Sequence, residues 1–194
     1  MGRVLGPSFQ PALDGARHGD DTAFATLWRE LQPPLLRYLQ VAAGDSAEDV
    51  ASETWVRVTR DLARFTGDEA GFRAWVFTIA RHRLLDWRRR VARTRTQPVA
   101  EVVDRGASDD PAAAALERLS TDAALALIAQ LPADQAEVVT LRAVAGLDVH
   151  QVARLVHKRP GAVRVLAHRG LHHLAELVAP ERAHDDPSPG VVTP

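Results

Sequence analysis

The amino-acid sequence predicts an all-α protein: two helical domains joined by a flexible linker, the C-terminal one a helix-turn-helix. Apolar residues recur at spacings of three and four through most of the 194-residue chain, and no stretch alternates convincingly as a β-strand does. All ten aromatic residues lie between Phe9 and Trp87, so the two halves differ in composition. Between the halves, residues 97–112 combine prolines, a glycine and acidic side chains with little helical period, which is typical of a linker.

The overall composition narrows the class of protein. The chain carries 46% hydrophobic residues, a formal net charge of −1 and no cysteine. The lack of cysteine excludes disulfides, thiolate metal sites and thiol redox chemistry within this chain. No apolar run approaches the roughly 20 residues that span a bilayer, and no basic-then-apolar leader opens the sequence. We therefore expect a cytoplasmic protein without direct membrane contact.

The first helical domain is expected over residues 15–96, after a disordered start over residues 1–14. Asp20 or Asp21 is placed to cap its first helix, which buries side chains at spacings of three and four. The proline pair at 33–34 is expected to interrupt that helix.

The rest of this domain reads as a second helix, a loop and a third helix. Gly44 ends the preceding element, and Ser46 with Asp49 resembles a capped start for the next helix. A loop with two glycines follows at residues 65–71, and a helix of aromatic and basic residues covers 72–90. The loop and this helix carry the strongest functional signal of the chain.

Positive charge is concentrated on this aromatic-basic helix. Between Arg73 and Arg95 there are eight arginines and one acidic residue, Asp86, in a chain that is nearly neutral overall. Arginines neutralise phosphates, and aromatic rings stack on bases that have left the duplex. The combination indicates a protein that handles opened DNA. An amphipathic helix with Trp75 and Leu84 in the core and its arginines solvated explains the stretch about equally well.

The second helical domain is expected over residues 113–179, ahead of a disordered tail over residues 180–194. A short helix capped by Asp148, a tight turn and a longer helix beginning at Pro160 form a helix-turn-helix pattern. Small residues such as Gly161 let the N-terminus of the last helix approach a DNA backbone closely. A helical bundle with a solvated basic face fits the same pattern.

Histidines raise one enzymatic alternative. His168 and His172 lie four residues apart on the last helix, with His150 and His157 upstream. A zinc site needs a third ligand and often a carboxylate partner, and the sequence has neither a His-Glu-x-x-His pattern nor a glycine-rich phosphate loop. We therefore expect no enzymatic activity, no cofactor and no metal site.

Segments from both halves resemble one protein family in order and spacing. The segments are Asp45–Val58, Phe72–Arg90, Leu131–Arg142, Ala145–Ala153 and Pro160–Arg164. On these the chain resembles the extracytoplasmic-function (ECF, group 4) sigma factors of bacteria, the minimal two-domain members of the sigma-70 family. The first segment resembles the helix that docks on the polymerase clamp, the second the promoter −10 helix, and the others the −35-binding domain. The resemblance covers about residues 18–178.

The resemblance implies a sigma factor that binds core RNA polymerase, directs it to −35/−10 promoters and promotes −10 melting. The implied partners are the beta-prime clamp and the beta flap of the polymerase, promoter DNA and an anti-sigma factor. Residues 15–96 would be sigma region 2, residues 113–179 sigma region 4, and the acidic linker a thread through the polymerase channels or a plain spacer. A stand-alone helix-turn-helix regulator is the alternative, although it would need neither a clamp helix nor a −10 helix.

The resemblance also assigns site residues. Core polymerase binding is expected at Glu48, Asp49, Glu53 and Trp55, where Trp55 either supports the fold or edges the contact. Binding of the −10 DNA strand is expected to involve Thr66, Arg73, Trp75, Arg81, His82, Arg88 and Arg89. Binding of the −35 element is expected to involve Arg142, Lys158, Arg159, Gly161, Arg164 and His168. The chain departs from the family at His157, where the turn usually carries glycine, and at His82, where asparagine is frequent.

Overall fold

The computed structural model describes residues 5–94 and 113–178, and these residues contain helices and turns but no β-strand. The N-terminal helices are α1 (Phe9–Arg17), α2 (Asp21–Ala43), α3 (Ala47–Asp61) and α4 (Glu69–Thr94), with 3-10 turns at Gly6–Ser8, Gly44–Ser46 and Leu62–Arg64. The C-terminal helices are α5 (Ala113–Ala129), α6 (Ala133–Val139), α7 (Val149–Val156) and α8 (Pro160–Val178), with a π-helical turn at Thr140–Val144. The predicted all-α class with two helical regions is confirmed, whereas the predicted linker and tail lie outside the described residues.

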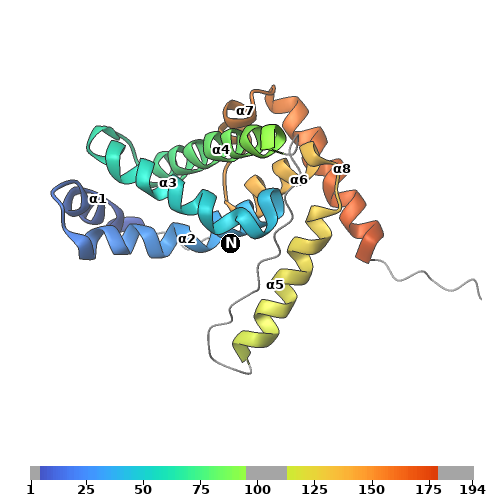
Figure 1. Ribbon diagram of the computed structural model, residues 1–194, viewed down its shortest axis with the longest axis horizontal. Coiled ribbons are helices and arrows are strands. Elements are labelled where there is room, and N and C mark those ends of the chain that lie inside the picture. Colours follow the sequence, from blue (N-terminus) through green and yellow to red (C-terminus); the bar gives the residue numbers. More distant parts are fainter. Residues whose placement is uncertain (1–4, 95–112, 179–194) are drawn as a thin grey trace, which may run out of the picture.

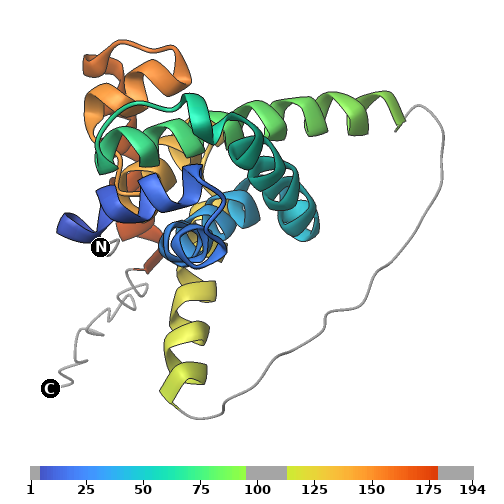
Figure 2. The ribbon, with the colours of Figure 1, turned by 90° about the vertical axis from the view of Figure 1, so that its left-hand side faces the viewer.

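The helices form two groups that touch along one side. Helices α1 to α4 form the first group, and α6, α7 and α8 form the second, while α5 contacts α2, α6 and α8 and extends outward from them (Figure 1). Figure 2 shows α4 extending beyond the body of the molecule at its C-terminal end. The first group is centred on large buried side chains, among them Leu13, Leu27, Leu35, Tyr38, Phe72, Phe77 and Leu84. The α2 helix is the axis of the fold because it contacts α1, α3, α4 and α5.

The first helix begins closer to the N-terminus than the sequence predicted. Residues 1–14 were expected to be disordered, but helix α1 begins at Phe9, and both Phe9 and Leu13 are buried. Pro11 does not prevent this, because the N–H groups of a first helical turn have no intrahelical partner. The α1 and α2 helices approach so closely that a Cβ on Gly15 would lie 2.7 Å from the Cβ of Ala23. The expectation was wrong because tertiary burial stabilises a helix with weak local signals.

The proline pair does not interrupt α2. Pro33 and Pro34 both lie inside a continuous helix of 23 residues. A proline in a helix interior costs about 3 kcal/mol because it removes a hydrogen bond and clashes with the preceding turn. Here Leu31, Leu35 and Leu39 are each 3% exposed or less, so burial on either side of the prolines offsets that cost.

The local start and stop signals gave a mixed result. Asp20 caps α2, since its carboxylate accepts hydrogen bonds from the N–H groups of Thr22 and Ala23. Gly44 ends α2 with a φ of 56°, as predicted. Ser46 makes no side-chain cap to α3, which instead begins after a 3-10 turn, so the predicted capping pair with Asp49 was wrong.

The second group contains the predicted helix-turn-helix, with α7 as its first helix and α8 as its second. The α8 helix packs on α6 and α7 and buries Val163 and Gly170. A Cβ on Gly170 would lie 2.6 Å from a methyl group of Val139, so α8 and α6 are in close contact there. Pro160 occupies the first position of α8, where its missing N–H costs no hydrogen bond.

Candidate functional site

The acidic side chains predicted to bind polymerase lie together on α3. Glu48 and Asp49 are exposed in its first turn, where the helix dipole favours negative charge. Glu53 lies one turn further on and is half-buried, and its Oε1 accepts a hydrogen bond from Nη2 of Arg90 on α4 at 2.8 Å. Two of the three acids are therefore freely accessible, and the third is linked to the aromatic-basic helix.

Trp55, the fourth predicted polymerase-binding residue, faces inward. It is 8% exposed, and its indole Nε1 donates to Oε1 of Gln32 at 2.6 Å. Its ring meets the edge of the Phe24 ring at a centroid distance of 5.8 Å. These contacts join α3 to α2, so the geometry favours support of the fold over direct contact with a partner.

Two exposed apolar residues accompany the acids, and the sequence analysis did not assign them. Val56 is 60% exposed on α3. Trp28, which the sequence periodicity placed in the core, is 39% exposed on α2. It lies four residues from Phe24 and four from Gln32, the two residues that hold Trp55, so it borders the same side of α3. Sequence spacing could not separate Trp28 from Trp55, because both fit an apolar stripe.

The loop between α3 and α4 rests on an aromatic cluster. The Phe65 ring lies 5.1 Å from the Trp75 ring and 5.2 Å from the Phe72 ring, measured between centroids. Gly67 has a φ of 152°, and a Cβ there would lie 3.0 Å from the Phe65 ring. Thr66 is exposed next to this glycine, while Trp75 is half-buried against the cluster. The loop therefore presents a polar tip over a rigid aromatic base.

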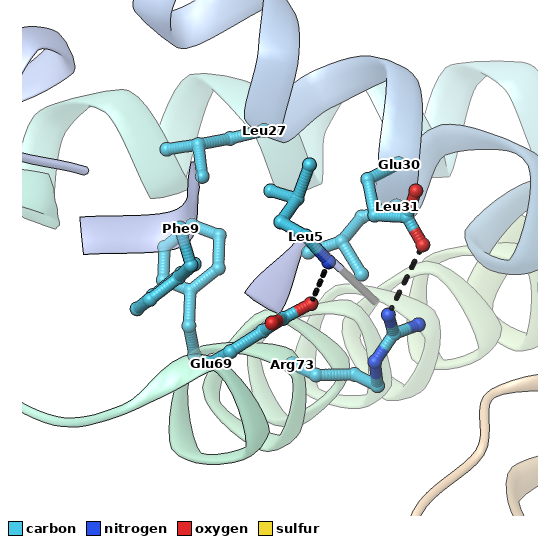
Figure 3. A pocket seen from close by; sticks show the side chains of 8 residues that line it. Leu5, Phe9, Leu27, Glu30, Leu31, Glu69 and Arg73 are labelled. Carbon is cyan, nitrogen blue, oxygen red and sulfur yellow. Dashed lines mark hydrogen bonds and ion pairs between the residues drawn. The ribbon is translucent and has the colours of Figure 1, made fainter. Parts of the chain in front are cut away.

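The start of the chain holds this loop from outside, which the sequence analysis missed. The Arg17 guanidinium donates a hydrogen bond to the carbonyl oxygen of Phe65. Glu69, the first residue of α4, accepts hydrogen bonds from the N–H groups of Leu5 and Gly6 at 2.7 and 2.9 Å. Figure 3 shows the bond between Leu5 and Glu69 at the edge of a small pocket. The contacts at Glu69 thus involve residues 5 and 6, in the segment that was expected to be disordered, whereas Arg17 holds the other end of the loop from α1.

Arg73, predicted to contact the −10 strand, lies inside the fold. It is 7% exposed, and its Nη2 lies 3.4 Å from Oε1 of Glu30 on α2 (Figure 3). Both side chains of the pair are nearly buried, at 9% and 11% exposure. Removing one partner of such a pair leaves an uncompensated buried charge. The geometry therefore favours a role for Arg73 in fixing α4 to α2.

The basic residues further along α4 are accessible. His82, Arg88 and Arg89 are all exposed. Arg88 donates to the carbonyl oxygen of Ala42 at 3.0 Å, and Arg89 lies 3.3 Å from the carboxylate of Asp86. Exposed pairs of this kind contribute little stability. These guanidinium groups can therefore exchange their present partners for DNA phosphates at low cost.

Arg81 lies at the contact between the two helix groups. Its Nε donates to Oε1 of Glu137 on α6 at 2.8 Å, and the Tyr38 hydroxyl donates to the same oxygen at 3.3 Å. The Arg81 and Glu137 side chains are only 15% and 21% exposed. Burial, followed by the nearby Glu137 carboxylate, raises the pKa of the Tyr38 hydroxyl far above its usual range, so the hydroxyl stays protonated. In this arrangement Arg81 does not face solvent as a DNA-binding residue would.

The helix-turn-helix is shaped by local caps. The Asp148 carboxylate accepts hydrogen bonds from the N–H groups of His150 and Gln151, and the Gln151 side chain accepts one from the N–H of Asp148. The N–H of Gln151 is the main cause that lowers the pKa of the Asp148 carboxyl below its ordinary value. His157 then ends α7 with a φ of 56° in the left-handed region. A histidine therefore adopts the conformation for which the family usually has glycine.

The residues predicted to bind the −35 element fall into two sets. Those exposed at the start of α8 are Arg159, Gly161, Arg164 and His168. A Cβ on Gly161 would meet nothing within 4 Å, so the beginning of α8 is open to a close approach. Lys158 and Arg142 are engaged within the protein: Lys158 Nζ lies 2.9 Å from an Asp134 carboxylate oxygen. Arg142 Nη1 donates to the carbonyl oxygen of Leu147 at 2.8 Å and so braces the turn before α7.

The histidines of α8 have neighbours on the surface. His172 Nδ1 lies 3.1 Å from Glu176, and His173 Nδ1 lies 2.9 Å from Gln135. Within residues 5–94 and 113–178, no three histidine, aspartate or glutamate side chains are placed to hold a metal ion. The same described ranges contain no helix that is both long and apolar enough to cross a membrane.

Family comparisons agree with this architecture. The family model of sigma-70 region 2 matches residues 27–94, and the model of sigma-70 region 4 matches residues 114–174. The chain is 33% identical over 169 residues to the ECF RNA polymerase sigma factor SigD of Mycobacterium tuberculosis, covering 83% of this chain and 80% of that protein. It is 37% identical over 177 residues to the ECF RNA polymerase sigma factor ShbA of Streptomyces griseus, covering 84% and 91%. The ECF sigma factor BldN of Streptomyces coelicolor is 32% identical, and the chain spans 64% of its length.

Solved structures show the same fold. The sigma factor RpoE of Bartonella quintana, in complex with the anti-sigma factor NepR, matches 82% of this chain and 98% of its own, with a TM-score of 0.60 and 21% identity. CnrH, in complex with the cytosolic domain of CnrY, matches 88% and 96%, with a TM-score of 0.60 and 20% identity. A match to region 2 excludes the stand-alone helix-turn-helix regulator, which has no such domain. The chain therefore belongs to the ECF RNA polymerase sigma factors, the group of the sigma-70 family that directs RNA polymerase to promoters.

Proposed function

We propose that this sigma factor docks on core RNA polymerase through α3, holds the opened −10 strand on the 65–71 loop and α4, and reads the −35 duplex with α8. One observation supports the proposal: a single chain presents two different surfaces whose shape and charge suit DNA. A polar loop over aromatic rings beside an arginine-rich helix suits a single strand, and an exposed helix with small and basic residues suits a groove of duplex DNA. The protein acts in the cytoplasm and has no catalytic activity of its own.

The polymerase contact uses the exposed acids of α3. Glu48 and Asp49 supply negative charge to the basic beta-prime clamp. Glu53 becomes available for the same contact when Arg90 leaves it and binds a DNA phosphate instead. The apolar neighbours Trp28 and Val56 would add a patch that loses water on docking, which acids alone do not provide. The beta flap is the partner for region 4. The clamp assignments rest on exposure and charge on α2 and α3, whereas the flap assignment rests on membership of the family alone.

The −10 contact uses the loop tip and the outer cations of α4. Thr66 lies where an extruded base would meet the loop, and the rings beneath it give the loop a fixed shape. His82, Arg88 and Arg89 lie along the path of the strand backbone. Trp75 and Arg73 act indirectly, by holding the loop and α4 in place. Since unstacking a base costs a few kcal/mol, a preformed loop lowers the cost of melting.

The −35 contact uses the exposed face of α8. Arg159, Arg164 and His168 reach phosphates or base edges, and Gly161 lets the helix N-terminus approach a phosphate. Arg142 and Lys158 contribute from beside the turn if DNA displaces their present partners. An exposed salt bridge such as that of Lys158 and Asp134 is weak enough for this exchange.

An anti-sigma factor is the expected regulator. Both solved structures of the same fold contain a second protein, which is the anti-sigma factor NepR in one complex and the cytosolic domain of CnrY in the other. These likenesses establish fold only, so the partner of this chain is inferred from the family. A partner of this kind would cover the polymerase-binding surface of region 2 and region 4.

Co-elution of the purified chain with bacterial core RNA polymerase tests the proposal. The triple variant Glu48→Ala, Asp49→Ala, Glu53→Ala should bind core at least tenfold more weakly, because it removes the acidic face of α3. A matched variant, Asp21→Ala, Asp122→Ala, Glu176→Ala, removes the same charge from exposed positions elsewhere and should bind as the wild type does. Equal loss in both variants would reduce the α3 contact to a general charge effect, and no binding by the wild type would overturn the proposal.

A further inference from the structure

Glu137 joins region 4 to the DNA-binding helix of region 2. One of its carboxylate oxygens accepts hydrogen bonds from both Arg81 on α4 and Tyr38 on α2. Tyr38 is 1% exposed and its ring meets the edge of the Phe77 ring, which is fully buried. A carboxylate that is nearly enclosed by two donors of another domain is a specific contact, because an unpaired buried charge would be strongly disfavoured.

The contact extends beyond this group. The π-helical turn and α6 pack on α2, and Val138 and Leu141 belong to the same apolar core as the residues of region 2. On the other side, Gln151 Nε2 of α7 donates to the carbonyl oxygen of Ala70, at the start of α4, at 3.0 Å. Figure 2 shows the α6–α8 group beside the N-terminal half of α4. Region 4 thus lies against the loop and helix that are proposed to hold the −10 strand.

This arrangement cannot occupy both promoter elements at once. The −35 and −10 elements lie about 25 base pairs apart, or about 85 Å along a duplex that rises about 3.4 Å per base pair. Region 4 in its present position contacts region 2 through hydrogen bonds at Ala70 and Arg81. The two regions must therefore separate before one chain can bind both elements.

We propose that the region 2 surface around Tyr38 and Arg81 is a docking site for α6 of the same chain, and that Glu137 occupies Arg81 in place of a DNA phosphate. The inference rests on the proposed role of α4 in binding the −10 strand. Carboxylates and phosphates are both strong partners for a guanidinium, and the Arg81 side chain is only 15% exposed beside Glu137, so a DNA phosphate reaches it only after α6 moves away. The free protein is then closed, and promoter or polymerase binding must displace Glu137. Regulation in this form needs no second protein.

Energy transfer between two dyes tests the closed state directly. The chain has no cysteine, so cysteines introduced at the exposed positions Thr59 on α3 and Ala175 on α8 are its only labelling sites. We expect high transfer in the unbound protein and low transfer in Glu137→Arg, where like charges face each other. The exchange Arg81→Glu with Glu137→Arg restores opposite charges and should restore high transfer. Unchanged transfer in Glu137→Arg would overturn the proposal.

A control substitution separates this contact from a general effect of charge. Glu176→Arg makes the same change at an exposed position of α8 and should leave transfer as in the wild type. Circular dichroism establishes that each variant is folded. If Glu137→Arg does not fold, the double variant Arg81→Glu, Glu137→Arg still tests the pairing. High transfer in the folded double variant supports the pairing, and low transfer contradicts it.

Competition with DNA is measured with a dye-labelled pool of randomised 20-nucleotide single strands, because the promoter sequence is not needed for a phosphate contact. Glu137→Gln adds no cation but releases Arg81, so it should bind the pool about 5- to 10-fold more tightly than the wild type. Combining it with Arg81→Gln should abolish the gain. A gain that survives without Arg81, or no gain at all, would contradict the competition.

The two proposals fail in different ways. A wild type that is closed but never binds core polymerase would retain the docking site and overturn the proposed function. A wild type that binds core polymerase but has the same dye separation in Glu137→Arg would keep the proposed function and overturn the docking site. High transfer that falls when core polymerase is added supports both.

Discussion

The arginines predicted to bind DNA are placed differently in region 2 and region 4, because in region 2 some of them lie inside the fold while Arg88 and Arg89 are exposed. In region 2, Arg73 and Arg81 lie within ion pairs that are largely buried. In region 4, Arg159 just before α8 and Arg164 on α8 are both exposed. One region therefore builds its site from packed aromatic rings and internal charges, and the other from a bare helix surface.

The difference matches the two tasks. Duplex DNA already has a fixed shape, so a helix with exposed cations can dock in its groove without further support. An opened strand is flexible, so the protein must supply the shape that the strand lacks. Region 2 supplies it through the aromatic cluster, and through the bonds that Arg17 and Glu69 make at the two ends of the loop. Changes inside region 2 should thus affect DNA binding through structure, whereas changes on α8 should act by direct contact.

The largest effect is expected from Phe72→Ala, which removes the centre of the aromatic cluster. Phe72 is 2% exposed and contacts the rings of Phe9, Phe65 and Trp75. The cavity should lower the free energy of unfolding by about 4 kcal/mol, as measured by urea denaturation. Single-strand binding should fall with it, while duplex binding by α8 persists at low temperature.

An exposed apolar residue provides the control for that cavity. Val165 is 48% exposed on α8, and Val165→Ala should change the stability by less than about 0.5 kcal/mol. Equal loss of single-strand and duplex binding in Phe72→Ala would show that the two regions unfold as one unit and do not support DNA binding separately.

Two acidic partners of arginines on α4 allow a buried ion pair to be compared directly with an exposed one. Glu30→Gln removes the charge of the buried partner of Arg73 and should lower the free energy of unfolding by about 3 kcal/mol, because ion pairs in buried sites are costly to break. Asp86→Asn breaks the exposed pair with Arg89 and should cost less than about 0.5 kcal/mol. Thermal unfolding of both variants measures the contrast. A cost for Asp86→Asn as large as for Glu30→Gln would remove the distinction between internal and surface arginines.

Local sequence signals predicted the parts of this structure that local interactions form. The cap at Asp148, the helix end at Gly44 and the helix start at Pro160 each depend on a few neighbouring residues, and each is present. The order of motifs then allowed the family to be identified. These features could be predicted because their energetics are decided within one turn of helix.

Features that depend on distant contacts were not predictable in this way. Helix α1 and the unbroken α2 form because burial against other helices offsets poor local signals. The spacing of apolar residues in the sequence does not reveal that burial. Arg81 and Glu137 are separated by 56 positions, so no motif joins them. The inward position of Arg73 has the same cause, because its exposure is set by α2. The sequence therefore did not show which of the predicted site residues face solvent.

A smaller effect should distinguish the helix caps of the two regions. Asp148→Ala removes the cap of α7, a helix of only eight residues. The change should lower the free energy of unfolding by about 1 kcal/mol at neutral pH. Asp20→Ala removes the cap of α2, which burial along 23 residues also supports, and should cost less. The comparison measures how far region 4 depends on local interactions. Chemical denaturation at pH 7 provides both values.

The Asp148 cap also carries a pH signature. Hydrogen bonds to the ionised carboxylate lower the pKa of Asp148 in the folded state, so its contribution is present above the ordinary value of about 4. It is lost as the pH falls through the lowered pKa. The stability difference between wild type and Asp148→Ala should therefore shrink in acid. A difference that stays constant down to pH 2 would mean that the cap acts without its charge.

The smallest effect should come from the turn that the family usually builds with glycine. His157 has a φ of 56°, a conformation that costs a side-chain-bearing residue about 1 kcal/mol or more. His157→Gly relieves this strain but adds freedom to the unfolded chain, so we expect a net gain of about 0.5 kcal/mol. His150→Gly makes the same change seven positions earlier, inside α7, and should destabilise by a similar amount. Opposite signs for two identical substitutions would show that the turn conformation itself, rather than loss of the imidazole, sets the stability of the helix-turn-helix. If both variants lose stability, His157 makes contacts that outweigh its backbone strain, and region 4 depends on tertiary interactions as region 2 does.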